Sequence, residues 1–337
     1  MVSTLRCEAF ASRLNGAGLF SVDQPSTLNP PHMPAPTLDD RLRMRLRPPG
    51  SPVMYQSWRE LLFLHWDFPA EQIQATLPPG LHVDTFDGQA WLGVVPFWMR
   101  NIHPRWLPAV PGISNFLELN LRTYVHDDRG NCGVWFYSLD ANQSLAVWAA
   151  RKFFHLNYQH AVMTSTRDNA TGWTGFSSHR TGASADLNCQ FRFRPISPPR
   201  PAEPGSFEFF LVERYILFAC SPLVSGHHSQ GGVPPAPREG EAPAEPQATG
   251  DVDSRERLGR SLALPRGGEA RGQLYTGTVI HEPYQISEVE LPQWSDSLFP
   301  LNGFARPARP PVHAAMCRGV DVDIYPLVRQ RTRLDDD

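Results

Sequence analysis

The sequence is almost without lysine. Of its 31 lysine and arginine residues, only Lys152 is a lysine. Chemistry that starts from an amine side chain, such as Schiff-base formation, therefore has a single candidate residue.

The sequence also lacks the residue spacings of metal and cofactor sites. Its five cysteines form no CxxC pair, and its 12 histidines form neither HExxH nor HxH. It contains no P-loop, no GxGxxG after a predicted strand and no GxSxG elbow. We expect reduced thiols in a cytoplasmic protein that holds no metal and no cofactor.

Neither the net charge nor the hydropathy pattern indicates binding to nucleic acid or a membrane span. The formal net charge is only -3, whereas nucleic-acid binders usually carry a basic surface. The apolar run 91–99 ends at Arg100 and is far shorter than the roughly 18 to 20 residues of a membrane span. We expect a small-molecule ligand, no nucleic acid and no membrane, with homo-oligomer formation left open.

Two proline-rich stretches are poor in aromatic residues. The first, 1–53, has only Phe10 and Phe20, and the second, 221–271, has none. Such segments bury too little apolar surface to offset the entropy lost on ordering. We expect a disordered or loosely packed leader over 1–53, a low-complexity insertion over 221–271 and a charged tail over 328–337. One β-rich barrel domain, interrupted by the insertion, would then span 54–327.

Within that domain, short runs of β-branched and aromatic residues alternate with clusters of Gly, Pro, Asn and Asp, which predicts many strands. Helices are predicted at 69–76 and 143–155. The pattern favours a mainly β fold, either an antiparallel barrel or a sandwich, with one or two short helices. The predicted strands are 60–67, 81–86, 90–102, 116–126, 133–140, 161–166, 172–180, 185–194, 208–219, 273–282 and 320–325.

The predicted strand 116–126 alternates apolar and polar side chains. Its polar face carries Glu118, Asn120, Arg122 and Tyr124. Alone, this pattern is more typical of a face in solvent, with Glu118 and Arg122 as a weak surface pair. In a barrel, the same face would line a central cavity.

Three further residues are candidates. Asp140 ends the next predicted strand, where an aspartate is more typical of a turn or helix cap. Arg151 and Lys152 are neighbours on the predicted helix and point about 100° apart, so at most one of them faces a shared pocket. Lys152 lies on an apolar stripe, which fits a desolvated amine but is more typical of a snorkelling side chain.

Eight segments of the predicted core, taken in order, carry a family pattern. They are 58–66, 77–88, 95–97, 116–125, 136–141, 149–158, 213–215 and 277–284. Together they resemble the YqjF-like family, a domain of unknown function that is distantly related to acetoacetate decarboxylase.

The resemblance implies a cone-like β-barrel with an internal cavity, as in acetoacetate decarboxylase. It also implies that Glu118 is similar to a strand glutamate of the decarboxylases. Where those enzymes carry their Schiff-base lysine, this chain has Leu156-Asn-Tyr158 in place of the family's Leu-Pro-Tyr. Tyr158 thus stands in the place of the amine, which argues against Schiff-base decarboxylation.

Three hypotheses for function remain. The first is a cavity that binds or transforms a small carbonyl or carboxylate compound by acid/base chemistry, as a lyase or isomerase without a Schiff-base lysine. The second is a non-enzymatic barrel whose tryptophans line a site for an apolar ligand. The third, disfavoured, is a Schiff-base decarboxylase that uses Lys152. For the first hypothesis, the catalytic candidates are Glu118, Tyr158 and Arg151, and the ligand-binding candidates are Arg122, Asn120, Tyr124 and Asp140, with Arg122 or Arg151 as the anion anchor.

Overall fold

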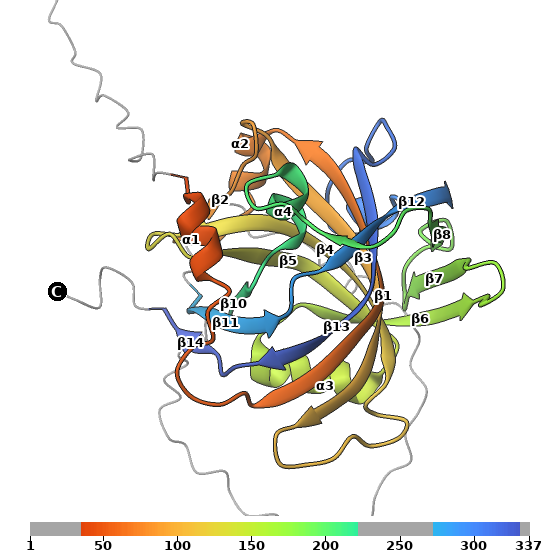
Figure 1. Ribbon diagram of the computed structural model, residues 1–337, viewed down its shortest axis with the longest axis horizontal. Coiled ribbons are helices and arrows are strands. Elements are labelled where there is room, and N and C mark those ends of the chain that lie inside the picture. Colours follow the sequence, from red (N-terminus) through yellow and green to blue (C-terminus); the bar gives the residue numbers. More distant parts are fainter. Residues whose placement is uncertain (1–34, 222–271, 331–337) are drawn as a thin grey trace, which may run out of the picture. The chain divides into compact units, whose positions relative to one another are not determined.

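The computed structural model describes residues 35–221 and 272–330 (Figure 1). The remainder of the predicted leader, insertion and tail lies outside the described residues. The elements are α1 (Leu38–Arg43), β1 (Met54–Phe68), α2 (Ala70–Gln74), β2 (Leu81–Val83), β3 (Ala90–Pro104), β4 (Phe116–Asp127), β5 (Cys132–Ala141), α3 (Ser144–Phe154), β6 (Tyr158–Arg167), β7 (Thr174–Arg180), β8 (Cys189–Pro195), β9 (Arg200–Pro201), α4 (Phe207–Val212), β10 (Ile216–Cys220), β11 (Leu274–His281), β12 (Gln285–Gln293), α6 (Leu298–Leu301), β13 (His313–Ile324) and β14 (Val328–Arg329).

A closed circuit of strands forms a cone-like β-barrel, which confirms the predicted fold class. Each strand pairs with the next in the order β1, β3, β4, β5, β10, β11, β13 and back to β1. Every pairing in this circuit is antiparallel except that between β5 and β10. At that junction Gly133 is required, because a Cβ atom there would overlap the backbone of Ile216.

A second set of strands extends the sheet on one side. β6 pairs with β5 in parallel, and β6, β7, β8 and β12 then lead back to β13. β6 and β7 form the hairpin that projects to the right in Figure 1. The sheet therefore has a core on each of its two faces.

Strand β4 separates these two cores. Leu117, Leu119 and Leu121 pack in one core, and all 12 residues of β4 are buried. Its polar face is therefore not a solvent face, contrary to the simplest interpretation of the alternating pattern. Glu118 and Arg122 form no ion pair with each other.

The boundary of the leader also differs from the prediction. Helix α1 lies within the stretch expected to be loosely packed, and Thr37 caps it. Arg41 forms a 2.5 Å ion pair with Asp84, and Arg45 forms a 3.1 Å pair with Glu213. Helix α1 buries none of its own residues and is held by ion pairs. The lack of aromatic residues therefore wrongly indicated that this part of the chain is loosely packed.

The predicted strand over 208–219 is a helix followed by a strand. Ser206 accepts a hydrogen bond from the backbone N–H of Phe209 and so caps α4, and β10 begins only at Ile216. The continuous apolar run 209–212 is buried on all sides, so it has no periodicity that separates helix from strand. β12 was not predicted, because apolar and charged residues alternate in its sequence and because it contains Pro292.

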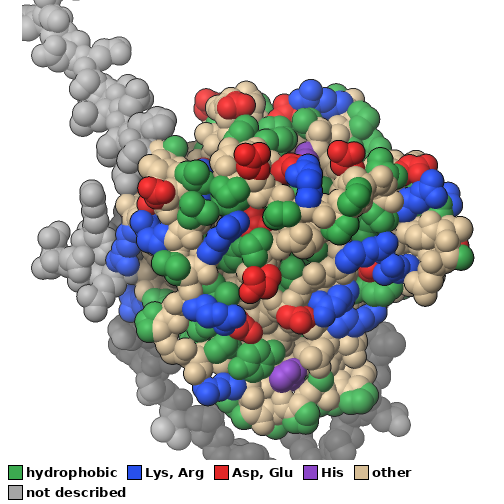
Figure 2. Space-filling view, in the orientation of Figure 1, with side chains coloured by type: hydrophobic (Ala, Val, Ile, Leu, Met, Phe, Trp, Pro, Cys, Tyr) green, Lys and Arg blue, Asp and Glu red, His purple; other side chains and the backbone are tan. Residues whose placement is uncertain are grey.

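On the face shown in Figure 2, basic and acidic side chains are interspersed. Within residues 35–221 and 272–330, no helix is long and apolar enough to cross a membrane.

Candidate functional site

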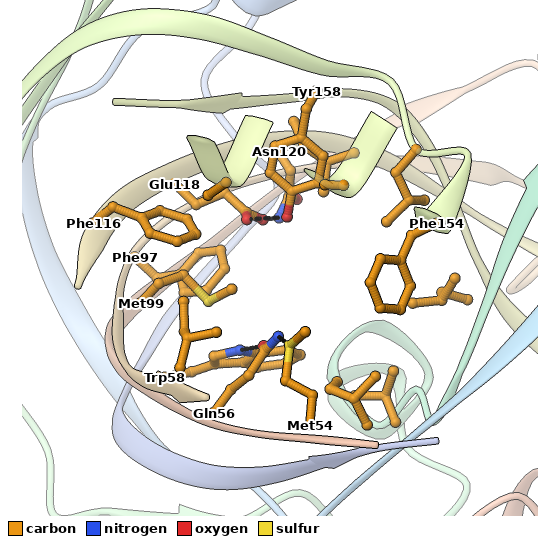
Figure 3. A pocket seen from close by; sticks show the side chains of 18 of the residues that line it. Met54, Gln56, Trp58, Phe97, Met99, Phe116, Glu118, Asn120, Phe154 and Tyr158 are labelled. Carbon is orange, nitrogen blue, oxygen red and sulfur yellow. Dashed lines mark hydrogen bonds between the residues drawn. The ribbon is translucent and has the colours of Figure 1, made fainter. Parts of the chain in front are cut away.

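The barrel encloses a cavity of about 380 Å³ (Figure 3). Leu107, Val110, Ile113 and Leu145 line it and are also 41–53% exposed to solvent. They come from the β3–β4 loop and the start of α3, so this end is the mouth. The opposite end is lined by buried residues beside α4, and α3 and α4 lie at opposite ends of the barrel in Figure 1.

Glu118 points from β4 into this cavity. Its Oε2 atom accepts a 2.7 Å hydrogen bond from the Tyr158 hydroxyl, and its Oε1 atom accepts a 3.3 Å bond from Nδ2 of Asn120. Burial raises the pKa of Glu118 to about 7, although both hydrogen bonds act in the opposite direction. A carboxyl group that titrates near neutrality can both accept and release a proton at that pH.

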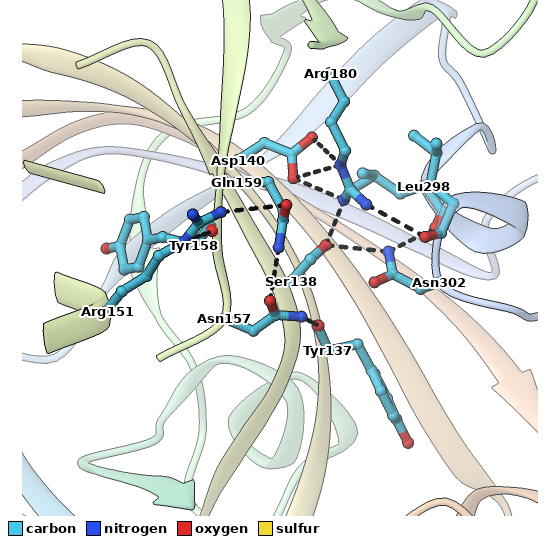
Figure 4. Close-up of polar contacts among 11 residues, drawn as sticks. Tyr137, Ser138, Asp140, Arg151, Asn157, Tyr158, Gln159, Arg180, Leu298 and Asn302 are labelled. Carbon is cyan, nitrogen blue, oxygen red and sulfur yellow. Dashed lines mark hydrogen bonds and ion pairs between the residues drawn. The ribbon is translucent and has the colours of Figure 1, made fainter. Parts of the chain in front are cut away.

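Tyr158 reaches the cavity from the first position of β6. Burial raises the pKa of its phenol well above the usual value, and the neighbouring Glu118 raises it further. The phenol therefore keeps its proton and acts as a donor. Two residues fix its backbone (Figure 4): Nε of Arg151 donates to the carbonyl of Tyr158 at 2.5 Å, and Asn157 donates to the carbonyl of Tyr137 at 2.6 Å.

Arg122 lies at the closed end of the cavity. The residue is 8% exposed, and its guanidinium carbon lies 5.6 Å from the ring centre of Phe63 and 5.8 Å from that of Tyr124. No carboxylate in the described part of the chain forms an ion pair with it. The nearby Arg214, by contrast, forms a 2.7 Å pair with Asp84.

Unpaired polar atoms concentrate in this cavity. Eight buried side-chain nitrogen or oxygen atoms of the described residues lack a hydrogen-bond partner. Four of these belong to cavity-lining residues: Oδ1 of Asn120, Nε and Nη2 of Arg122, and Nη2 of Arg214. Since an unpaired buried polar atom is costly, such a concentration is typical of a ligand site.

The structure brings together Glu118, Tyr158, Asn120 and Arg122 among the candidates named from the sequence. Tyr124 shares their face of β4 but is not among the cavity-lining residues, and its hydroxyl lies 2.6 Å from Nε2 of His65.

Asp140 and Arg151 lie outside the cavity. Asp140 points to the other face of the sheet and pairs with Arg180 at 2.7 Å (Figure 4). This ion pair is buried, so it belongs to the core on the face of the sheet opposite the cavity. Arg151 is exposed on α3 and contacts the backbone of Tyr158 rather than the cavity. Lys152 is also exposed on α3 and does not line the cavity.

Several residues that line the cavity are not among the candidates named from the sequence. Trp58 donates a 2.8 Å hydrogen bond to Gln56, and both point into the cavity from β1, opposite Glu118 (Figure 3). Their i, i+2 spacing on a predicted strand face was the available signal. Of the tryptophans in the described ranges, only Trp58 lines the cavity. The cavity is therefore not the tryptophan-lined site that was expected for an apolar ligand. No group of His, Cys, Asp or Glu among the described residues could hold a metal ion.

Solved structures of similar fold are acetoacetate decarboxylase-like. The acetoacetate decarboxylase-like enzyme of Sphingomonas wittichii RW1 is 14% identical, with a TM-score of 0.50 over 84% of this chain and 95% of that chain. The enduracididine biosynthesis enzyme MppR, complexed with the condensation product of pyruvate and imidazole 4-carboxaldehyde, is 11% identical, with a TM-score of 0.52 over 83% and 90%. At these identities the likeness shows the fold alone.

Sequence comparison shows the family. The model of DUF2071, described as an uncharacterized conserved protein, matches residues 55–226. The uncharacterized protein YqjF of Bacillus subtilis (strain 168) is 42% identical over 171 residues, which are 51% of this chain and 69% of that protein. The chain belongs to the DUF2071 family of uncharacterized conserved proteins.

Proposed function

We propose that the cavity binds a small carbonyl or carboxylate compound and that Glu118 transfers protons to and from it, while the hydroxyl of Tyr158 holds the carboxyl group by a hydrogen bond. One observation carries the proposal: a buried carboxyl with a pKa of about 7 faces the cavity and accepts a 2.7 Å hydrogen bond from a phenol. General acid/base catalysis is most efficient when the pKa of the group lies near the working pH.

Arg122 serves as the anion anchor in this proposal. A guanidinium binds a carboxylate through two parallel hydrogen bonds, and two of its nitrogen atoms have no partner within the described structure. Asn120, one strand pleat away, offers an unpaired carbonyl oxygen. A bound carboxylate would satisfy the unpaired donors of Arg122, and a hydroxyl or N–H group of the ligand would be needed to donate to Asn120.

The proposed step is proton abstraction next to a carbonyl group. Ionised Glu118 accepts the proton, and the electron pair of the broken C–H bond moves onto the carbonyl oxygen to give an enolate. Tyr158 remains hydrogen-bonded to the carboxyl throughout. Return of the proton to another face or another carbon atom yields an isomer, so the reaction class is enolisation or isomerisation.

The test is exchange of substrate hydrogen for deuterium in D2O, followed by ¹H NMR on a panel of 2-oxo and 3-oxo acids. Wild type is expected to exchange the hydrogen next to the carbonyl in at least one acid. Glu118→Gln is expected to lower the rate at least 100-fold, within the range for a general base. If no acid exchanges, or if Glu118→Gln exchanges as fast as wild type, the proposal is wrong.

Two controls accompany this measurement. Thermal shifts with the same acids should stabilise wild type but not Arg122→Ala, which tests the anchor separately. Borohydride treatment in the presence of acetoacetate should leave Lys152 unmodified, because that side chain lies outside the cavity. A trapped adduct on Lys152 would favour the Schiff-base reaction instead.

The apolar cavity wall between Glu118 and the mouth favours a second function. In this function the barrel binds a mainly apolar ligand and is not an enzyme. Phe97, Met99, Phe116 and Phe154 line this region (Figure 3). Ligand-dependent stabilisation without hydrogen exchange would support this function over catalysis.

A further inference from the structure

The buried arginines of the cavity and its exposed apolar rim lie at different ends. Along β4 from the mouth inward the lining residues are Phe116, Glu118, Asn120 and Arg122. Successive positions on one strand face are about 6.8 Å apart, so Arg122 lies roughly 20 Å of strand away from Phe116. The positive charge of Arg122 is thus at the bottom, and Phe116 is toward the opening.

The closed end carries more positive than negative charge. Arg122 has no ion-pair partner among the described residues, and Arg214 shares Asp84 with Arg41. Arg214 and Arg41 hold the pKa of Asp84 below its usual value despite its burial. An anionic group placed here would be attracted by the net charge and would satisfy unpaired donors.

The mouth has the opposite character. Leu107, Val110, Ile113 and Leu145 are all apolar, all line the cavity and are all about half exposed. Trp106, next to this rim, is 74% exposed. Exposed apolar side chains that continue inward as a cavity wall are typical of a ligand entrance.

The volume exceeds the needs of a very small acid. A cavity of about 380 Å³ lies within the range that takes ligands of drug size. A four-carbon oxo acid at Arg122 would leave most of the apolar wall without contacts. Apolar cavities bind apolar groups in preference to water.

From this arrangement we infer that the ligand is an amphipathic monocarboxylic acid. Its carboxylate lies at Arg122 and its apolar chain extends past Glu118 to the mouth formed by Leu107 and Leu145. This inference rests on the proposed function, because it assigns the substrate class of the same site. It adds the direction of binding, with the head group inside and the chain outward.

The experiment is a titration of wild type with straight-chain carboxylates of four, six, ten and fourteen carbons and with primary alcohols of the same lengths. Trp58 lines the cavity, so tryptophan fluorescence can report binding, with calorimetry as a second readout. Each added methylene is expected to tighten Kd about threefold to fourfold until the chain emerges at the mouth. At equal length the alcohols are expected to bind at least tenfold more weakly.

Variants locate the two ends of the ligand. Leu145→Asp is expected to weaken tetradecanoate at least tenfold and to leave butanoate within twofold. The matched control is Val162→Asp, because Val162 is 65% exposed on β6 and does not line the cavity. It should leave both acids unchanged. Arg122→Gln is expected to remove the difference between acid and alcohol.

The outcomes separate the two proposals. If butanoate or a short oxo acid binds in an Arg122-dependent manner and longer chains gain nothing, the inference is overturned while the proposed function stands. If acids and alcohols of each length bind equally in wild type, the anion anchor and the proposed function both fail. If no acid binds at all, the inference is likewise overturned.

Discussion

Tyr158 donates a 2.7 Å hydrogen bond to Oε2 of Glu118 across the inner face of β5. Glu118 belongs to β4 and Tyr158 to β6, and these two strands pair with opposite edges of β5. Both residues are buried, at 3% and 7% exposure, and both line the cavity. Any change in the protonation of Glu118 therefore acts on this bond.

The pH dependence of stability should report Glu118. Its pKa is about 7 in the folded protein and near the ordinary value of 4.5 in the unfolded chain, so the folded state binds the proton more tightly. Stability is therefore lost as pH rises from about 4.5 to about 7, by about 3 kcal/mol in all. Glu118→Gln should remove this loss, measured by urea unfolding at pH 5 and pH 8. Glu282→Gln, at an exposed position, is the control and should keep the wild-type difference.

Loss of the Tyr158 hydroxyl should raise the pH at which the protein loses stability. The hydrogen bond from Tyr158 lowers the pKa of Glu118, so Tyr158→Phe should raise the pH at which stability falls. It should also cost about 1 to 3 kcal/mol at pH 8, where the bond to the ionised carboxylate is strongest. Tyr137→Phe is the matched control, since the hydroxyl of this buried residue bonds to the Thr76 hydroxyl at 2.6 Å and not to a carboxylate. An unchanged midpoint in Tyr158→Phe would contradict the assigned hydrogen bond.

Arg122 and Arg214 should respond differently to the same substitution. Arg122→Met removes a buried charge that has no ion-pair partner within the described structure. Without ligand, the free energy of unfolding of this variant should therefore equal or exceed that of wild type. Arg214→Met breaks a buried pair with Asp84 and should lower stability by about 3 kcal/mol. Urea unfolding of both variants is the measurement. A loss of similar size in Arg122→Met would make Arg122 a structural residue.

The pair between Asp140 and Arg180 should matter for stability and not for ligand binding. Both residues are buried, and Arg180 also donates to Ser138 at 2.8 Å. Arg180→Met should cost about 3 to 5 kcal/mol, because it leaves the Asp140 charge without its partner. Adding Asp140→Leu should recover much of that loss. In the double variant the ligand-induced thermal shift should equal that of wild type, and its disappearance would place Asp140 in the site after all.

Most strands could be predicted from local sequence because β-branched and aromatic runs between turn residues are a local signal. Prediction failed where the signal was not local. The run 209–212 is apolar on every side, so only the cap at Ser206 and the packing at one end of the barrel make it helical. Helix α1 and the residues after it are held by ion pairs of Arg41 with Asp84 and of Arg45 with Glu213, whose acidic partners are distant in the chain.

The sequence by itself determined the family, the mainly β fold and the polar face of β4, because alternation and motif order are written along the chain. Only the tertiary structure decided what that face meets. Closure of the strands into a barrel turned the polar face inward, raised the pKa of Glu118 by desolvation and left Arg122 without a carboxylate. The same closure placed Asp140 on the opposite face and Lys152 outside the cavity, because side-chain direction depends on which strands pair.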